Sequence, residues 1–121
     1  MSSIQDCLKS ANDFKDKMNG NKKIGQLLKR WSPLIHFDTN DSDVKITFDI
    51  TGGQVNSVNE GHTGNPDLVV TFPTTADLTD MFCGRLDPTP KYLSGEILVK
   101  GHQADVIKLD AITIIIWPDE H

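Results

Sequence analysis

The sequence predicts an α+β domain whose sheet buries one face and leaves the other face in water. Apolar residues recur with the helical period of 3.6 as far as Trp31, and after Pro33 they recur with the strand period of 2. Strand-like and helix-like segments then follow one another. The length of 121 residues is typical of one domain. We therefore expect one domain over 1–121, with N-terminal helices in 2–31 and the sheet and C-terminal helices in 32–117.

Two helices are predicted before the sheet. The first begins at a cap provided by Ser2 or Ser3 and ends at Asn19-Gly20. The second covers residues 22–31, and Ser32-Pro33 ends its pattern. The residues expected to pack against the core are Ile4, Cys7, Leu8, Ala11 and Met18 in the first helix, and Ile24, Leu27, Leu28 and Trp31 in the second.

The basic residues gather near the N-terminus. Residues 1–31 hold seven Lys or Arg and three Asp, whereas the rest of the chain is strongly acidic and the net charge is −5. That balance argues against nucleic acid as a partner. The other faces of the second helix carry four basic residues, whose charge suits transient contact with an anionic membrane surface. They are Lys22, Lys23, Lys29 and Arg30.

Five segments are predicted to be strands. Residues 43–50 alternate cleanly, with Val44, Ile46, Phe48 and Ile50 on one face. The turn before that segment has some calcium-loop positions but lacks the glycine and the final glutamate of such a loop, which favours a plain hairpin. The first three strands are expected to form an antiparallel meander. The five segments are residues 34–38, 43–50, 54–60, 67–72 and 96–101.

Three more helical segments are expected. Thr74 with Asp77 resembles a capping box for a helix that ends at Gly84. A short helix opens at Thr89-Pro90, and a last helix covers residues 102–111. The β-branched run at 112–117 is read as extended, and Pro118 terminates it.

The sequence offers little for catalysis or metal binding. No nucleotide-binding or nucleophile motif is present, and four histidines show no metal-ligand spacing. We expect no catalytic residue, no metal and no cofactor. Cys7 and Cys83 stand far apart and are expected to be reduced thiols, and Arg85 is expected to form a surface salt bridge. Because no signal peptide, membrane span or organelle address is recognisable, a cytoplasmic location is expected.

Four short motifs in order resemble the sterol carrier protein-2 family. They are the strand PDLVVT at 66–71, the helix end GRLDP at 84–88, the strand GEILVKG at 95–101, and Lys108-Leu109 in the closing helix. The resemblance covers about residues 32 to 112. It implies a five-stranded, mainly antiparallel or mixed sheet, with helices on one face that enclose an apolar tunnel.

The same resemblance implies a non-enzymatic protein that binds a sterol, a fatty acid or a fatty acyl-CoA. A cavity for such a lipid needs at least about 300 Å³. The residues expected to line it are Phe48, Val70, Leu78, Met81, Phe82, Leu86, Tyr92, Leu93, Val106, Leu109 and Ile112.

Two other functions stay open from the sequence. In one, the chain is an accessory or dimerisation domain that uses the same apolar face to bind a protein. In the other, it is a small enzyme that acts on a lipid thioester through Cys83 or a histidine.

Overall fold

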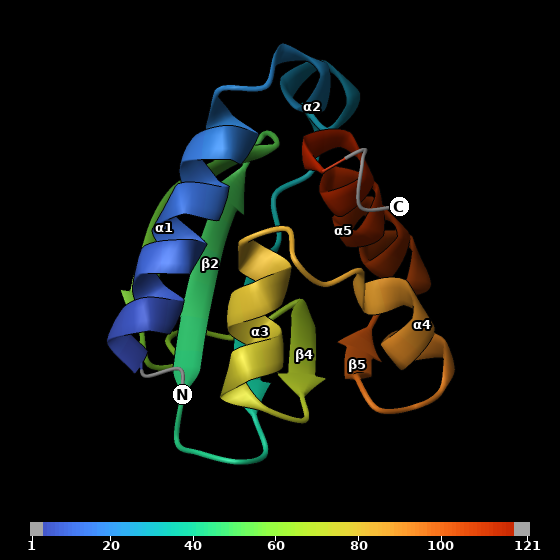
Figure 1. The fold of residues 1–121 in the computed structure, drawn as a ribbon. Helices are drawn as coiled ribbons and strands as arrows, with labels where there is room; N and C mark the ends of the chain where they lie inside the picture. The colour runs from blue at the N-terminus through green and yellow to red at the C-terminus, as the bar shows by residue number, and fades with distance from the viewer. Residues whose placement is uncertain (1–3, 118–121) are drawn as a thin grey trace.

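A mixed five-stranded sheet is covered on one face by helices (Figure 1). The computed structural model describes residues 4–117. The elements in chain order are α1 (Ile4–Asn19), α2 (Lys22–Leu27), β1 (Leu34–Thr39), β2 (Lys45–Thr51), β3 (Gln54–Glu60), β4 (Leu68–Phe72), α3 (Thr75–Phe82), α4 (Pro88–Leu93), β5 (Leu98–Gly101) and α5 (Gln103–Ile116).

The strands lie in the order β3-β2-β1-β4-β5. Adjacent strands β1, β2 and β3 pair antiparallel, which confirms the predicted meander and hairpin. The chain then crosses over, so that β4 runs parallel to β1 with Phe37 opposite Val70. Strand β5 pairs antiparallel with β4 and forms one edge of the sheet. The expected fold class is therefore confirmed.

The helix-covered face of the sheet contains the aromatic part of the core. Ile46, Phe48 and Ile50 are buried while Lys45 and Asp49 of the same strand are exposed, as the alternation predicts. The Phe82 ring of α3 lies 5.4 Å from that of Phe48, and the Phe14 ring of α1 lies 5.5 Å from Phe82. Phe14 was not among the core residues predicted for the first helix.

A loop covers part of the opposite face. Thr47 is buried there because its Oγ1 donates a hydrogen bond to the carbonyl of Gly61 at 2.7 Å. His36 is buried beside it, and its Nε2 lies 2.8 Å from the carbonyl oxygen of Thr63. Its ring stacks on that of His62 at 4.2 Å. Both histidines are thus held by loop packing.

The second helix is shorter than the sequence predicts. It ends at Leu27, and the amide of Trp31 donates instead to the carbonyl of Leu28 in a following turn. Gly53, at the tip of the β2–β3 hairpin, packs against the backbone of Leu28, and its amide donates to the Trp31 carbonyl. These tertiary contacts outweigh the weak helical preference of a segment that contains Gly25. Leu27 was expected on the buried face but is 62% exposed.

The extended reading of residues 112–117 was wrong, because α5 continues through Ile116. β-branched residues cost only a few tenths of a kcal/mol each in a helix, and burial of Ile112 and Thr113 outweighs that cost. The expected stop at Pro118 and the expected caps Ser2 and Ser3 lie outside the described residues.

Candidate functional site: an apolar cavity under the last two helices

An apolar cavity of about 190 Å³ lies between the β4–β5 side of the sheet and helices α4 and α5. Figure 1 shows α4 and α5 grouped beside β5. The apolar and aromatic residues along its wall are Phe37, Val70, Phe72, Met81, Pro88, Tyr92, Leu93, Ile97, Val99, Val106, Ile107 and Leu109.

The predicted tunnel residues divide between the cavity and the core. Those that line the cavity come from β4, α3, α4 and α5: Val70, Met81, Tyr92, Leu93, Val106 and Leu109. Those that do not line it are Phe48, Leu78, Phe82 and Ile112, which are buried in the core, and Leu86, which packs on the core from the loop after α3.

Sequence reasoning missed the contribution of the central strands and of β5. Phe37 and Phe72 share the sheet face of Val70, and the strand alternation could have identified them. Ile97, directly before β5, and Val99, within it, extend the same wall. The position of Ile107 at the cavity could not have been predicted. The helical period shows which residues share a helix face, but not which element that face contacts.

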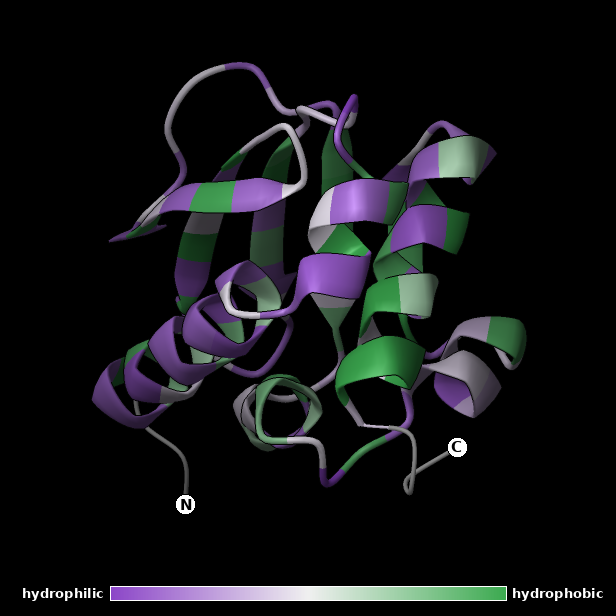
Figure 2. Cartoon of the chain, turned by 90° about the horizontal axis from the view of Figure 1, so that it is seen from above, coloured by the Kyte–Doolittle hydropathy of each residue, from purple (hydrophilic) through white to green (hydrophobic). Residues whose placement is uncertain are grey.

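The mouth of the cavity is unusually apolar for a surface region. Leu93 is 76% exposed and Ile107 is 61% exposed, although both also line the cavity. Ile114 is exposed two turns after Ile107 on α5, whereas the exposed Leu98 alternates with Val99 in β5 and therefore lies on the opposite face of the sheet. The last turns of α5 are strongly hydrophobic as they approach the C-terminal end (Figure 2).

Polar groups on the cavity wall are few. The Thr89 hydroxyl at the start of α4 donates a hydrogen bond to Oδ1 of Asp110 on α5 at 2.8 Å. Thr113 also lines the cavity, but its hydroxyl donates to the backbone carbonyl of Asp110 at 2.7 Å. The remaining polar side chains on the wall are those of Gln103 and the phenol of Tyr92.

Helix α5, which forms one wall, is held by a small set of contacts. The indole Nε1 of Trp31 donates to Oδ1 of Asp105 at 2.8 Å, near the start of the helix. At the other end, the Lys17 ammonium lies 4.9 Å from the centre of the Trp117 ring. A Cβ on Gly84, whose φ is +79°, would collide with that ring, so glycine is required there.

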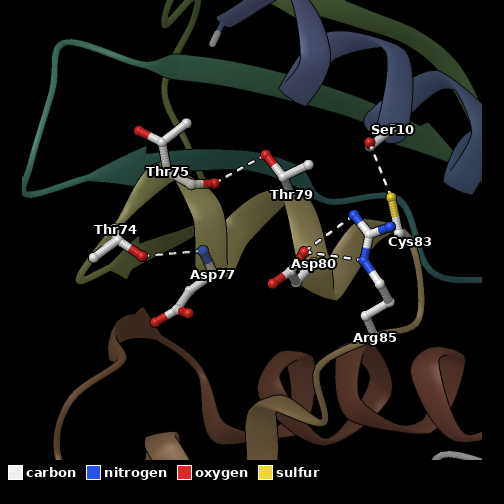
Figure 3. A network of polar contacts seen from close by, with 8 residues as sticks. All are labelled: Ser10, Thr74, Thr75, Asp77, Thr79, Asp80, Cys83 and Arg85. Carbon is white, nitrogen blue, oxygen red and sulfur yellow. Dashed lines mark hydrogen bonds and ion pairs between the residues drawn. The ribbon is translucent and has the colours of Figure 1, made fainter. Parts of the chain in front are cut away.

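The remaining candidate reactive groups lie away from the cavity. Sγ of Cys83 is 3.1 Å from the Ser10 hydroxyl, between α3 and α1 (Figure 3). Cys7 is fully buried on α1, and that burial raises the pKa of its thiol above the ordinary value. Arg85 forms the predicted surface salt bridge, with Nη2 3.1 Å from Oδ1 of Asp80 (Figure 3).

The cationic residues of the α2 region are all exposed. Lys22 and Lys23 lie in the helix, and Lys29 and Arg30 follow in the turn after it. The exposed Leu27 lies among them. This cluster of Lys22, Lys23, Leu27, Lys29 and Arg30 is called the α2 patch below.

The described residues contain neither a grouped set of metal ligands nor a membrane-spanning helix. Within residues 4–117, no three His, Cys, Asp or Glu side chains are grouped so that they could hold a metal ion. No helix in that range has both the length and the apolar character to cross a membrane.

Comparison with known proteins places this geometry in context. The model of the SCP-2 sterol transfer family matches residues 11–113. Hydroxysteroid dehydrogenase-like protein 2 from Homo sapiens is 38% identical over 56 residues, which are 46% of this chain and 13% of that protein. The chain thus matches only a small part of the length of this curated relative.

Solved structures share the fold. The sterol carrier protein domain 2 of Helicoverpa armigera has a TM-score of 0.72 and 18% identity, over 91% of this chain and 87% of that one. The UbiJ-SCP2 ubiquinone synthesis protein has a TM-score of 0.67 and 15% identity, over 88% and 86%. At such low identity these likenesses concern the fold, whereas the family match spans most of the chain. The chain belongs to the SCP-2 sterol transfer family.

Proposed function

We propose that this protein is a non-enzymatic carrier that holds the apolar part of a sterol, a fatty acid or a fatty acyl-CoA in the cavity under α4 and α5. The observation that carries the proposal is the apolar wall formed by β4, β5, α3, α4 and α5, which opens through the exposed Leu93 and Ile107. Each CH₂ group moved from water into such a wall gains about 0.8 kcal/mol. Acyl chains and sterol rings supply that kind of surface.

The cavity must widen to hold a whole lipid. Its volume of about 190 Å³ is below the roughly 300 Å³ of the smallest typical ligand sites. Helix α5 is the wall best suited to move, because Ile112 and Thr113 are its buried residues while Ile107 and Ile114 are exposed. We infer that an outward shift of α5 turns the cavity into the apolar tunnel expected from the sequence.

Transfer between membranes needs no chemical step in this scheme. A bilayer offers an acyl chain an apolar environment much like the cavity, so the free energies of the two states are close and the lipid can exchange. Cys83 contacts Ser10 and does not line the cavity, which disfavours a thiol-dependent enzyme at this site.

We further propose that the α2 patch touches anionic membranes during exchange. It combines four exposed cations with one exposed leucine, the composition that suits an anionic headgroup layer. The resulting encounter is transient and takes place from a cytoplasmic pool of the protein.

An accessory role is the second candidate. The human relative is much longer than the matched segment, so a domain of this kind forms part of a larger protein there. The exposed apolar residues Leu93, Ile107 and Ile114 would then contact an enzyme partner or a second copy.

Native mass spectrometry after gentle purification distinguishes these candidates. A carrier is expected to retain a noncovalent lipid or to take up an added fluorescent fatty acid or sterol with a ratio near one per chain. A ligand-free dimer that binds neither the fluorescent fatty acid nor the sterol would support the accessory role and reject the carrier.

A further inference from the structure

The cavity wall of the described residues carries one charged side chain. Of the described residues that line it, Asp110 is the one that is charged, and it is partly buried. The lining residues one helical turn away on α5 are Val106, Ile107 and Thr113, which are all neutral. A ligand in the cavity therefore meets one carboxylate in apolar surroundings.

No Lys or Arg side chain forms an ion pair with Asp110 in the described part of the chain. The ion pairs there join Arg85 to Asp80, and Lys91 to Asp77 and Glu96. The partner of Asp110 is instead the neutral Thr89 hydroxyl, which donates to Oδ1. An ionised carboxyl group only accepts hydrogen bonds, so its other oxygen is suited to a donor on a ligand.

We propose that Asp110, in the carrier function proposed above, selects lipids whose polar group donates a hydrogen bond and carries no negative charge. Hydroxyl and amine headgroups satisfy this condition, so the inference narrows the ligands proposed above to those with such a group, sterols among them. The carboxylate of a free fatty acid, in contrast, meets Asp110 as a like charge. The repulsion is stronger in a partly desolvated cavity than in water. Asp110 thus determines headgroup specificity, and the apolar wall supplies affinity for the chain.

Three amphiphiles with the same alkyl chain test the proposal: dodecanol, dodecylamine and dodecanoate. Each is titrated into the full chain by calorimetry at neutral pH, below the concentration at which it forms micelles. Dodecanol and dodecylamine are expected to bind at least about ten-fold more tightly than dodecanoate, a ratio that allows for screening at a partly exposed site. Comparison of the alcohol with the amine shows whether a neutral or a cationic donor is preferred.

Asp110→Asn removes the charge but keeps an oxygen that accepts from Thr89. In this variant dodecanoate is expected to come within about three-fold of dodecanol, because the like-charge repulsion is removed and an amide NH₂ donor replaces the oxygen that would accept from dodecanol. Asp43→Asn is the matched control, since it changes the net charge equally at an exposed loop residue away from the cavity. It is expected to leave the preference unchanged.

The outcomes separate this inference from the carrier proposal. If dodecanoate binds the unmodified protein as tightly as dodecanol, headgroup selection by Asp110 is rejected and the carrier role stands. If Asp110→Asn and Asp43→Asn weaken the preference equally, the overall charge of the protein causes the preference, and the specific role of Asp110 is rejected. If none of the amphiphiles binds, both proposals fail.

Discussion

Phe82 and Leu93 are both apolar residues expected to line the tunnel, yet they occupy very different environments. Phe82 is fully buried, and its ring lies within 5.5 Å of those of Phe14, Phe37 and Phe48. Leu93 lies at the cavity mouth and is 76% exposed. One residue is therefore expected to matter for folding and the other for binding.

Alanine substitutions separate the two roles. Phe82→Ala is expected to lower the free energy of unfolding by about 3 to 5 kcal/mol, because it leaves a void in an aromatic cluster. Leu93→Ala is expected to change it by less than about 0.5 kcal/mol while weakening the binding of a fluorescent sterol. Urea unfolding and fluorescence titration measure the two effects. Equal loss of stability in both variants would contradict the distinction.

The same contrast shows what the sequence could predict about the site. Spacing placed Met81 and Phe82 on one helix face, but in the structure Met81 borders the cavity and Phe82 fills the core. Both environments select apolar side chains, so periodicity cannot separate them. The residues of α4 and α5 were placed by resemblance to a family, and Asp110 gave no pattern that would single it out.

Among whole elements, the strands were the most predictable. In β2, buried apolar residues alternate with exposed polar residues. Thr47 is the exception, because it is polar but is covered by a loop distant in sequence. The C-terminal half of α5 was misread because isoleucines favour strands locally and only packing against the core makes them helical. The early end of α2 depends on Gly53, which a local pattern could not reveal.

The α2 patch yields a prediction about membrane contact. Each lysine near an anionic surface contributes about 1 kcal/mol, so Lys22→Glu with Lys23→Glu is expected to weaken binding to phosphatidylserine vesicles by at least about ten-fold. The loss is expected to shrink at high salt. Vesicle sedimentation measures it.

A matched double variant controls for net charge. Lys45→Glu with Lys100→Glu changes the charge equally at two exposed residues of the sheet. This control is expected to retain most vesicle binding. An equal loss in both variants would show that overall charge, and not the α2 patch, governs the contact.

At the scale of the whole molecule, the cavity opposes stability. An enclosed empty cavity of 190 Å³ would cost about 4 to 5 kcal/mol at about 24 cal/mol per Å³, and this cavity, which opens to solvent at Leu93 and Ile107, costs less than that limit. Domains of ordinary size are stable by only about 5 to 15 kcal/mol. Unpacked apolar surface of this kind is consistent with a ligand-binding cavity. A bound lipid that fills it is expected to raise the free energy of unfolding.

Filling the cavity from within tests this relation between stability and binding. Val106 of α5 lines the cavity and is partly buried, so Val106→Phe places a larger apolar group inside it. We expect the variant to gain about 1 kcal/mol of stability and to lose most of its affinity for a fluorescent sterol. Thermal unfolding with and without ligand measures both quantities.

The ligand response of the melting temperature gives the sharper measurement. A ligand at a hundred times its dissociation constant stabilises the native state by about 2.7 kcal/mol, which raises the melting temperature of a domain this small by about 10 °C. Val106→Phe is expected to melt higher than the unmodified protein without ligand and to gain little when ligand is added. If the variant instead melts lower and still shows the full ligand response, the lipid binds somewhere other than this cavity, because a Phe side chain and the lipid cannot occupy the same space.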